Sequence, residues 1–306
     1  MPCRIVLLAL ILLFTGSRGS VWSEETELGD GGVVVRFEEP LRAAAKEVIE
    51  SCPAVRADLV KVLGPMREFS PVIRLVKDRE NFRRIADSDL IVAFAVPRQD
   101  LIVIDYSRMN IHPFTLDVTL KHELCHLQLH QRVREGNLPR WLDEGICQWV
   151  TGGIAEIMTD GSRSVLKEAV LSKQLIPLSE LSVRFPHEDR ALQLAYEESR
   201  SVVEYVNGEF GSAGVRNIVG HLGAGESLEE AIEKSLSISL GELETRWRAS
   251  LAKGTSWFAY TSNYLYEVLF LFGAVITVFG FLRFLKRKRD YRDKDGEDEG
   301  GKDFRL

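Results

Sequence analysis

Cysteine is scarce in this sequence, which excludes a fold held together by a framework of disulfides. The 306 residues include four cysteines, Cys3, Cys52, Cys125 and Cys147. Cys3 belongs to an N-terminal segment that we expect to be removed, and the odd number that remains cannot all pair. A single bridge between Cys125 and Cys147 is one interpretation, and buried free thiols are the other.

Positive charge is not in excess either. The formal net charge is −6 at pH 7, and no basic stripe interleaved with aromatic residues appears in the region between the two ends of the chain. These absences argue against a protein that binds nucleic acid. Internal repeats are also missing, and the length suits one or two globular domains with a sizeable core.

Long hydrophobic runs are confined to the two ends of the chain. Near the N-terminus, Arg4 precedes an apolar run over 5–14, and the small residues Ser17 and Gly19 follow it. This order predicts a secretory signal peptide over residues 1–19, because the run is short for a membrane span. An uncleaved N-terminal anchor is the alternative.

The second apolar run lies near the C-terminus and has no charged residue from Val268 to Leu282. With its flanking residues it predicts a transmembrane helix over 264–285, since about 20 residues cross ~30 Å of hydrocarbon. A basic cluster follows, made of Arg283, Lys286, Arg287, Lys288, Arg289 and Arg292. The positive-inside rule therefore places this end in the cytoplasm. A buried hydrophobic helix is the alternative.

The two ends together predict one topology. Residues 20–256 form a domain outside the cytoplasm, and a single span holds this domain at the membrane. Residues 286–306 are charged and nearly devoid of apolar side chains, so we expect a disordered cytoplasmic tail.

Strand patterns precede helical patterns in the region between the ends, which predicts an α+β fold. Strands are expected at 33–37, 72–78, 91–96 and 101–105, and helices at 40–63 and 79–86. Pro53 should break or kink the first helix. Further helices are expected at 115–133, 139–151, 163–174, 190–210, 213–222, 228–236 and 240–252. We expect a small mixed sheet with two helices in part 33–152 and a helical part 153–256, with a boundary near 152–162.

The segment TLKHELCHLQLH, residues 119–130, carries the strongest chemical signal. His122 and His126 are four positions apart, so on a helix both imidazoles point to one side, one turn apart. Two nitrogen ligands in this arrangement suit a tetrahedral Zn²⁺ ion. Glu123, next to the first histidine, is placed to polarise a water molecule rather than to bind metal.

A catalytic zinc site needs a third protein ligand and an open fourth position. His130 is one candidate, because it lies one turn after His126. Glu144 in LPRWLDEGICQWV, residues 138–150, is the other. Pro139 suits the first turn of a second helix, and a short turn before it would bring Glu144 close to the histidines.

HELCH followed by WLDEG resembles the gluzincin-type zinc metallopeptidases, which include the thermolysin-like and aminopeptidase N-like enzymes. With AYEES (195–199) and LGELETRWRASL (240–251), residues 33–252 are similar to the peptidase MA-like family. The resemblance implies a zincin-like domain that binds one Zn²⁺ per chain through His122, His126 and Glu144. It also implies that Glu123 is the general base and that the substrate is a peptide or protein. Because the similar proteins are bacterial, the resemblance further implies that the domain lies in the periplasm or at the cell surface.

The resemblance also draws attention to Tyr196 in AYEES, because related enzymes use a tyrosine or histidine to stabilise the oxyanion. A core aromatic residue with a satisfied hydroxyl is the alternative for Tyr196. His187 is a second candidate for the donor, with a surface position as its alternative. Asp143 either orients a ligand histidine or lies exposed at the start of its helix.

These observations predict a membrane-anchored zinc metallopeptidase in which Glu123 and Tyr196 are catalytic. No GxMEN-type exopeptidase segment precedes HELCH, which favours an endopeptidase. A zincin-fold scaffold or binding protein without turnover is the main alternative, and a hydrolase of non-peptide substrates is another. Glu123 favours catalysis, because a purely structural zinc site has no chemical need for that carboxylate.

Overall fold

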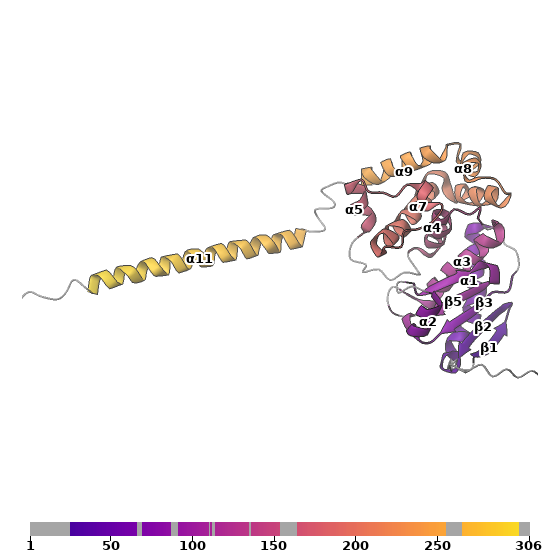
Figure 1. The fold of residues 1–306 in the computed structure, drawn as a ribbon, viewed down its shortest axis with the longest axis horizontal. Helices are drawn as coiled ribbons and strands as arrows, with labels where there is room; N and C mark the ends of the chain where they lie inside the picture. Colours follow the sequence, from indigo (N-terminus) through magenta and orange to yellow (C-terminus); the bar gives the residue numbers. More distant parts are fainter. Residues whose placement is uncertain are drawn as a thin grey trace, which may run out of the picture.

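The computed structural model describes residues 25–65, 69–86, 91–109, 111, 114–134, 136–153, 164–254 and 265–299 (Figure 1). The predicted signal peptide over 1–19 lies outside these residues. So does most of the predicted domain boundary over 152–162.

A five-stranded mixed sheet forms the first half of the domain, in the order β1-β2-β3-β5-β4. Its strands are β1 Glu25–Asp30, β2 Val33–Glu38, β3 Val72–Val76, β4 Ala93–Val96 and β5 Leu101–Asp105. The central strands β2, β3 and β5 are parallel, whereas β1 and β4 pair antiparallel at the two edges. The predicted mixed sheet is confirmed, and β4 and β5 form an antiparallel hairpin. Strand β1 was not predicted, because its side chains are exposed or only partly buried and show no apolar alternation.

Helix α1, Arg42–Leu63, packs along the sheet, and the short helix α2, Arg79–Ala86, follows β3. Pro53 lies inside α1, and the predicted break does not occur. The reason is that buried residues on both sides of Pro53, among them Cys52 and Val55, hold the helix against the core. Three short 3₁₀ helices complete this half: η1 Glu39–Leu41, η2 Pro97–Gln99 and η3 Tyr106–Arg108.

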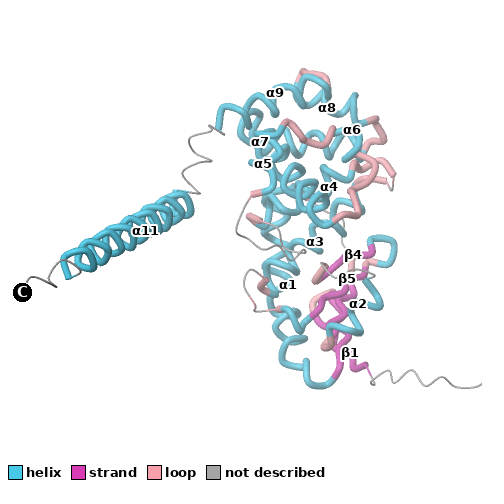
Figure 2. Tube along the Cα trace, turned by 60° about the vertical axis from the view of Figure 1, so that its left-hand side comes forward, coloured by secondary structure: helices cyan, strands magenta, loops and turns pink. Residues whose placement is uncertain are grey.

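The second half is helical, as predicted, and its layers are clearest in Figure 2. Its helices are α3 Leu116–Arg132, α4 Arg140–Thr151, α5 Val165–Ser172, α6 Leu178–Leu181, α7 Asp189–Gly223, α8 Leu228–Leu236 and α9 Leu240–Gly254. Two predicted helices are joined in α7, where Gly211 has a φ of 70° and marks a kink. The four-residue helix α6 is too short to produce a periodic pattern and was not predicted.

Helix α4 makes an unusually close contact with α7. A Cβ atom built on Gly145 would lie 2.3 Å from the carbonyl oxygen of Ser199, so only glycine fits there. Gln148 Nε2, one turn along α4, donates to the carbonyl oxygen of Tyr196 at 3.1 Å. The glycine of WLDEG and the segment AYEES therefore meet at one interface, which places α4 on α7.

Two adjacent glutamates of α7 attach the segment around α5. The Glu197 carboxylate accepts from Ser164 Oγ at 2.8 Å and from the Leu166 N–H at 3.0 Å, and so caps the start of α5. Glu198 is fully buried, and its Oε1 accepts from the Ile176 N–H at 3.0 Å. Its Oε2 has no hydrogen-bond partner within the described part of the chain. Burial raises the pKa of the Glu198 carboxyl to about 8, despite the opposing Ile176 N–H and the Arg248 charge.

Helix α11, Leu265–Glu299, stands apart from the rest of the chain in both views (Figures 1 and 2). Its segment Glu267–Lys288 is 22 residues long with a mean hydropathy of 2.3 and has no buried share, so it is long and apolar enough to cross a membrane. The helix continues to Glu299, whereas the sequence predicts disorder from residue 286. Lys, Arg and Glu are good helix formers, and no proline interrupts this stretch.

The α4–α7 contact predicts that Gly145→Ala destabilises the protein. The added methyl would overlap the backbone carbonyl oxygen of Ser199. We therefore expect a loss of about 1–3 kcal/mol in unfolding free energy, or more if the helices separate. Gly208→Ala in α7 is the control, because nothing lies within 4 Å of its Cβ position and a helical alanine should stabilise slightly. Urea unfolding measures both. Equal stability of the Gly145→Ala protein and the wild type would contradict the argument.

Buried Glu198 predicts a pH-dependent stability. Its folded pKa of about 8 lies above the ordinary glutamate pKa of 4.5, so the folded state keeps a proton that the unfolded state releases. Stability should therefore fall as pH rises from about 4.5 through about 8, by a few kcal/mol at about 1.4 kcal/mol per pKa unit. Glu198→Gln should remove this loss.

The measurement is urea unfolding of both proteins between pH 5 and pH 9. The advantage of Glu198→Gln should grow with pH, whereas the exposed Glu209→Gln on the same helix should show a constant difference from wild type. Parallel curves for wild type and Glu198→Gln would show that this carboxyl titrates normally.

Candidate metal centre

Helices α3 and α4 supply the candidate site. Thr115 caps α3, since its Oγ accepts from the Val118 N–H at 3.4 Å. Leucines on several sides of α3 are buried, at positions 116, 120, 124, 127 and 129, so the helix runs through the core. Helix α4 begins after Pro139, as predicted, and packs beside α3.

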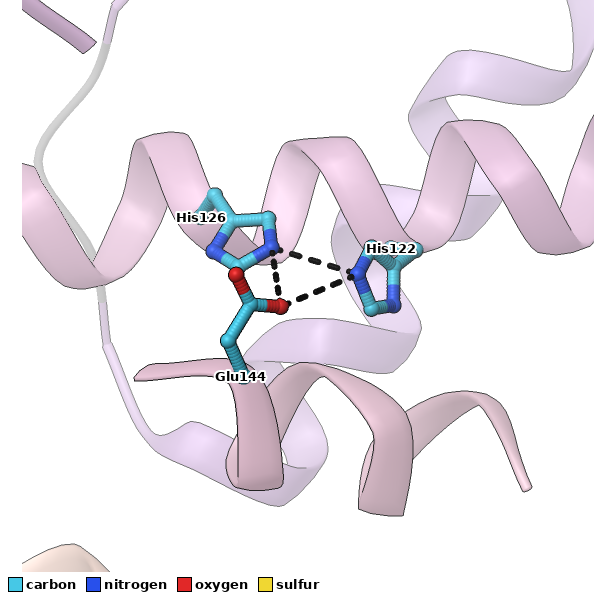
Figure 3. Close-up of side chains that lie close together, drawn as sticks. All are labelled: His122, His126 and Glu144. Atoms are coloured by element: carbon cyan, nitrogen blue, oxygen red, sulfur yellow. Dashed lines mark hydrogen bonds and ion pairs between the residues drawn. The ribbon is translucent and has the colours of Figure 1, made fainter. Parts of the chain in front are cut away.

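His122, His126 and Glu144 converge between these helices (Figure 3). The two Nε2 atoms are 3.2 Å apart, and Glu144 Oε2 lies 3.5 Å from His126 Nε2 and 3.8 Å from His122 Nε2. A tetrahedral zinc ion with bonds of about 2.0–2.2 Å separates its ligands by roughly 3.3–3.6 Å. The three atoms therefore have the mutual spacing that such an ion requires, and these residues could hold one.

Asp143 determines how His126 is turned. Asp143 Oδ1 lies 2.8 Å from His126 Nδ1, and Asp143 Oδ2 lies 2.8 Å from His130 Nε2. The carboxylate accepts a hydrogen bond from Nδ1–H of His126, which leaves Nε2 to face Glu144 and His122. Of the two roles considered for Asp143, the structure shows the orienting one. His130, the alternative third ligand, contacts Asp143 and does not join the ligand group.

The charges of this cluster depend on one another. Burial would raise the pKa of Glu144, but His126 and His122 outweigh burial and hold that pKa well below its usual value. Burial would lower the pKa of His126, but Asp143 and Glu144 outweigh it and raise that pKa well above its usual value. Both shifts have the same cause, the attraction between imidazoles and carboxylates inside the protein.

Glu123 and Tyr196 occupy buried positions near these elements. Glu123 follows His122 on α3 and is fully buried. Tyr196 on α7 is 2% exposed, and its ring packs edge-on against Phe185 with centroids 5.2 Å apart. Phe185 in turn lies under the guanidinium of Arg140, the first residue of α4. His187, the second candidate for an oxyanion donor, is exposed.

Cys125 and Cys147 are free thiols. Cys125 on α3 and Cys147 on α4 are both fully buried and unbridged, so the free-thiol interpretation holds in the structure. Burial, followed by a hydrogen bond with Cys125, raises the pKa of the Cys147 thiol well above its usual value. These thiols therefore serve as small apolar groups between the two helices.

The contacts of Arg140, Phe185 and Glu198 were not predicted from the sequence. The spacing of Arg140, one turn before Glu144 on the same helix, could have identified an ion pair. Phe185 lies in a loop without a periodic pattern, and the burial of Glu198 depends on segments distant in sequence. No local signal marks the last two.

Comparisons with known proteins give one family and two structures. The model of the Peptidase MA superfamily matches residues 90–253. None of the curated proteins matches the chain. The solved structures include a mutant M1 zinc metallopeptidase from Deinococcus radiodurans and a mutant two-domain M1 zinc metallopeptidase bound to L-tryptophan. Each shares 14% identity at a TM-score of 0.44, over 76% of this chain and 52% of that chain. This chain therefore spans about half the length of those structures.

Asp143 should control metal affinity. Asp143→Ala removes the group that orients His126, and loss of such a partner typically weakens metal binding about 10–100-fold. Glu144→Ala should weaken zinc binding further, because it removes a ligand atom. Asp117→Ala, an exposed acid in the first turn of α3, should have no effect. Competition with a chromophoric chelator measures each zinc affinity. Wild-type affinity in Asp143→Ala would show that His126 needs no second partner.

Proposed function

Because the chain belongs to the Peptidase MA superfamily, we propose that it is a zinc-dependent metallopeptidase with His122, His126 and Glu144 as its metal ligands. The observation that carries the proposal is the spacing of the three ligand atoms, 3.2–3.8 Å apart, which suits a tetrahedral ion. The orientation of His126 by Asp143 supports the proposal, because catalytic zinc sites use such partners.

In this proposal each side chain has a separate role in peptide hydrolysis. A zinc ion at the site would lower the pKa of a water molecule and polarise the substrate carbonyl. Glu123 accepts the proton that the water loses on attack and delivers it to the leaving amine. The Tyr196 hydroxyl donates a hydrogen bond to the oxyanion of the tetrahedral intermediate. Burial of Glu123 and Tyr196 excludes bulk water and strengthens both interactions.

We extend the proposal to the location of the domain. Helix α11 has a 22-residue apolar segment that no other part of the described chain covers, which suits a membrane anchor. Lys286, Arg287 and Lys288 end that segment, so the positive-inside rule assigns this end to the cytoplasm and the domain to the other side. The substrates would be peptides or proteins near that membrane surface, cleaved internally.

A scaffold protein with a structural zinc ion remains the competing function. Glu123 favours the peptidase, because a structural site would tolerate any side chain that packs at that position, whereas hydrolysis requires a base next to the metal. A single substitution therefore separates the two functions.

Glu123→Gln should keep one zinc ion and lose peptide hydrolysis by about 10²–10⁴-fold, since the amide cannot accept a proton. Zinc content is measured by elemental analysis, and hydrolysis by mass spectrometry of a mixed peptide library incubated with the full-length protein. Chelation should abolish wild-type cleavage, and added zinc should restore it. Cleavage that survives chelation or the Glu123→Gln substitution would refute the mechanism.

Tyr196→Phe tests the second catalytic assignment. The substitution removes one oxyanion donor and should lower kcat by about 10²–10³-fold with little change in zinc content. Tyr205→Phe on the same helix is the control and should leave kcat unchanged. A Tyr196→Phe protein with wild-type kcat would show that Tyr196 is only a core aromatic residue.

A further inference from the structure

The two carboxylate oxygens of Glu144 have different surroundings. Oε2 is the atom near both histidines, and Figure 3 shows both dashed lines from Glu144 leaving this same oxygen. Oε1 instead forms an ion pair with Arg140, whose Nη2 lies 3.7 Å away. Oε1 therefore faces the Arg140 cation, whereas Oε2 faces the two histidines.

The structure holds Arg140 in place from two sides. Its backbone N–H donates to the Ser182 carbonyl at 3.1 Å, and its guanidinium carbon lies 4.9 Å from the centre of the Phe185 ring. Phe185 is itself 6% exposed and packs against Tyr196. A guanidinium stacked on a fixed ring loses less freedom when it forms an ion pair than a free surface side chain does.

Stability alone does not account for this arrangement. The Arg140 side chain is 49% exposed, and ion pairs with an exposed partner contribute only about 0–1 kcal/mol. Glu144, in contrast, is 8% exposed, and its negative charge is the one that the metal site must use. The pair therefore matters more for the geometry of Glu144 than for the fold.

A carboxylate can bind a metal through one oxygen or through both. Binding through both adds a donor and fills the position that a catalytic zinc site must keep open for water and substrate. A fixed positive charge beside one oxygen competes with the metal for that oxygen and favours binding through the other. This competition requires a positive charge beside one oxygen only. Arg140 Nη2 is paired with Oε1 at 3.7 Å, whereas the two histidine nitrogens are paired with Oε2 at 3.5 and 3.8 Å.

We propose that Arg140 is a positioning residue that holds Glu144 Oε1 away from the metal, so that Glu144 binds through Oε2 alone and the fourth position stays open. The proposal rests on the proposed function, because it assumes that His122, His126 and Glu144 bind a metal ion. It predicts that loss of Arg140 changes the coordination number rather than the ability to bind metal.

The test uses the full-length protein in detergent, loaded with Co²⁺, because its visible absorption is strong in four-coordinate and weaker in five-coordinate sites. The variants are Arg140→Met, Arg140→Gln and Arg140→Lys. Arg200→Met is the matched control, since Arg200 forms an ion pair with Glu204 at the same sequence spacing on α7.

Wild type and Arg200→Met should give the same strong absorption. Arg140→Met and Arg140→Gln should bind Co²⁺ but absorb at least about twofold less, and Arg140→Lys should recover part of the difference because it restores the charge. In the peptidase assay, kcat of the first two should fall about tenfold with little change in KM, as for other groups that orient a ligand.

Spectra of Arg140→Met and Arg140→Gln that match wild type at full cobalt loading would overturn the proposal. Loss of cobalt binding in both variants would also overturn it, because a positioning role leaves the ligand atoms in place. The proposed function fails separately: a wild-type protein that binds Co²⁺ but cleaves no peptide would refute the peptidase, while the spectra would still decide the role of Arg140.

Discussion

The burial of ionisable side chains between α3 and α4 is the constraint on which the rest of the structure depends. Less than a tenth of the surface of His122, Glu123, His126 and Glu144 is exposed in each case. Charged groups taken out of water must be compensated by partners or by a metal ion, or the fold would be unstable. The neighbours meet this need in order: Asp143 faces His126, His130 faces Asp143, and Arg140 faces Glu144. This arrangement of charged groups is suited to holding one central cation.

The same constraint explains why α4 is pressed so closely onto α7. Glu144 reaches the histidines only if α4 is held at a fixed depth, and Gly145 allows the helix backbones to approach where any side chain would collide with Ser199. Gln148 then fixes the rotation of α4 through its hydrogen bond to the Tyr196 carbonyl. The residue after the proposed ligand is thus as important for the position of the ligand as the groups that touch it.

Much of the fold and of the site could be predicted from the sequence, because the signals are local. The helical positions of His122 and His126 follow from their spacing, and the central strands follow from runs of Val, Ile and Leu. The helical course of α1 through Pro53 could not be predicted, because tertiary packing overrides the local preference there. The surroundings of Tyr196 could not be predicted either, since Phe185, which packs on it, comes from a separate segment and is itself covered by Arg140. The sequence supplied two roles for Asp143, and only its distances to both histidines distinguish them.

Contacts with other parts of the protein restrict which residues the segment AYEES of α7 can accommodate. Ala195 is fully buried, and its carbonyl oxygen accepts a hydrogen bond from the Ser199 hydroxyl. Tyr196 packs on Phe185, and Ser199 lies against Gly145. The two glutamates between them hold the beginning of α5 and the chain at Ile176. Four of the five positions thus contact a different part of the protein, and a substitution at any of these four must be accommodated by a separate segment. These five adjacent residues therefore join four segments that are distant from them in the sequence.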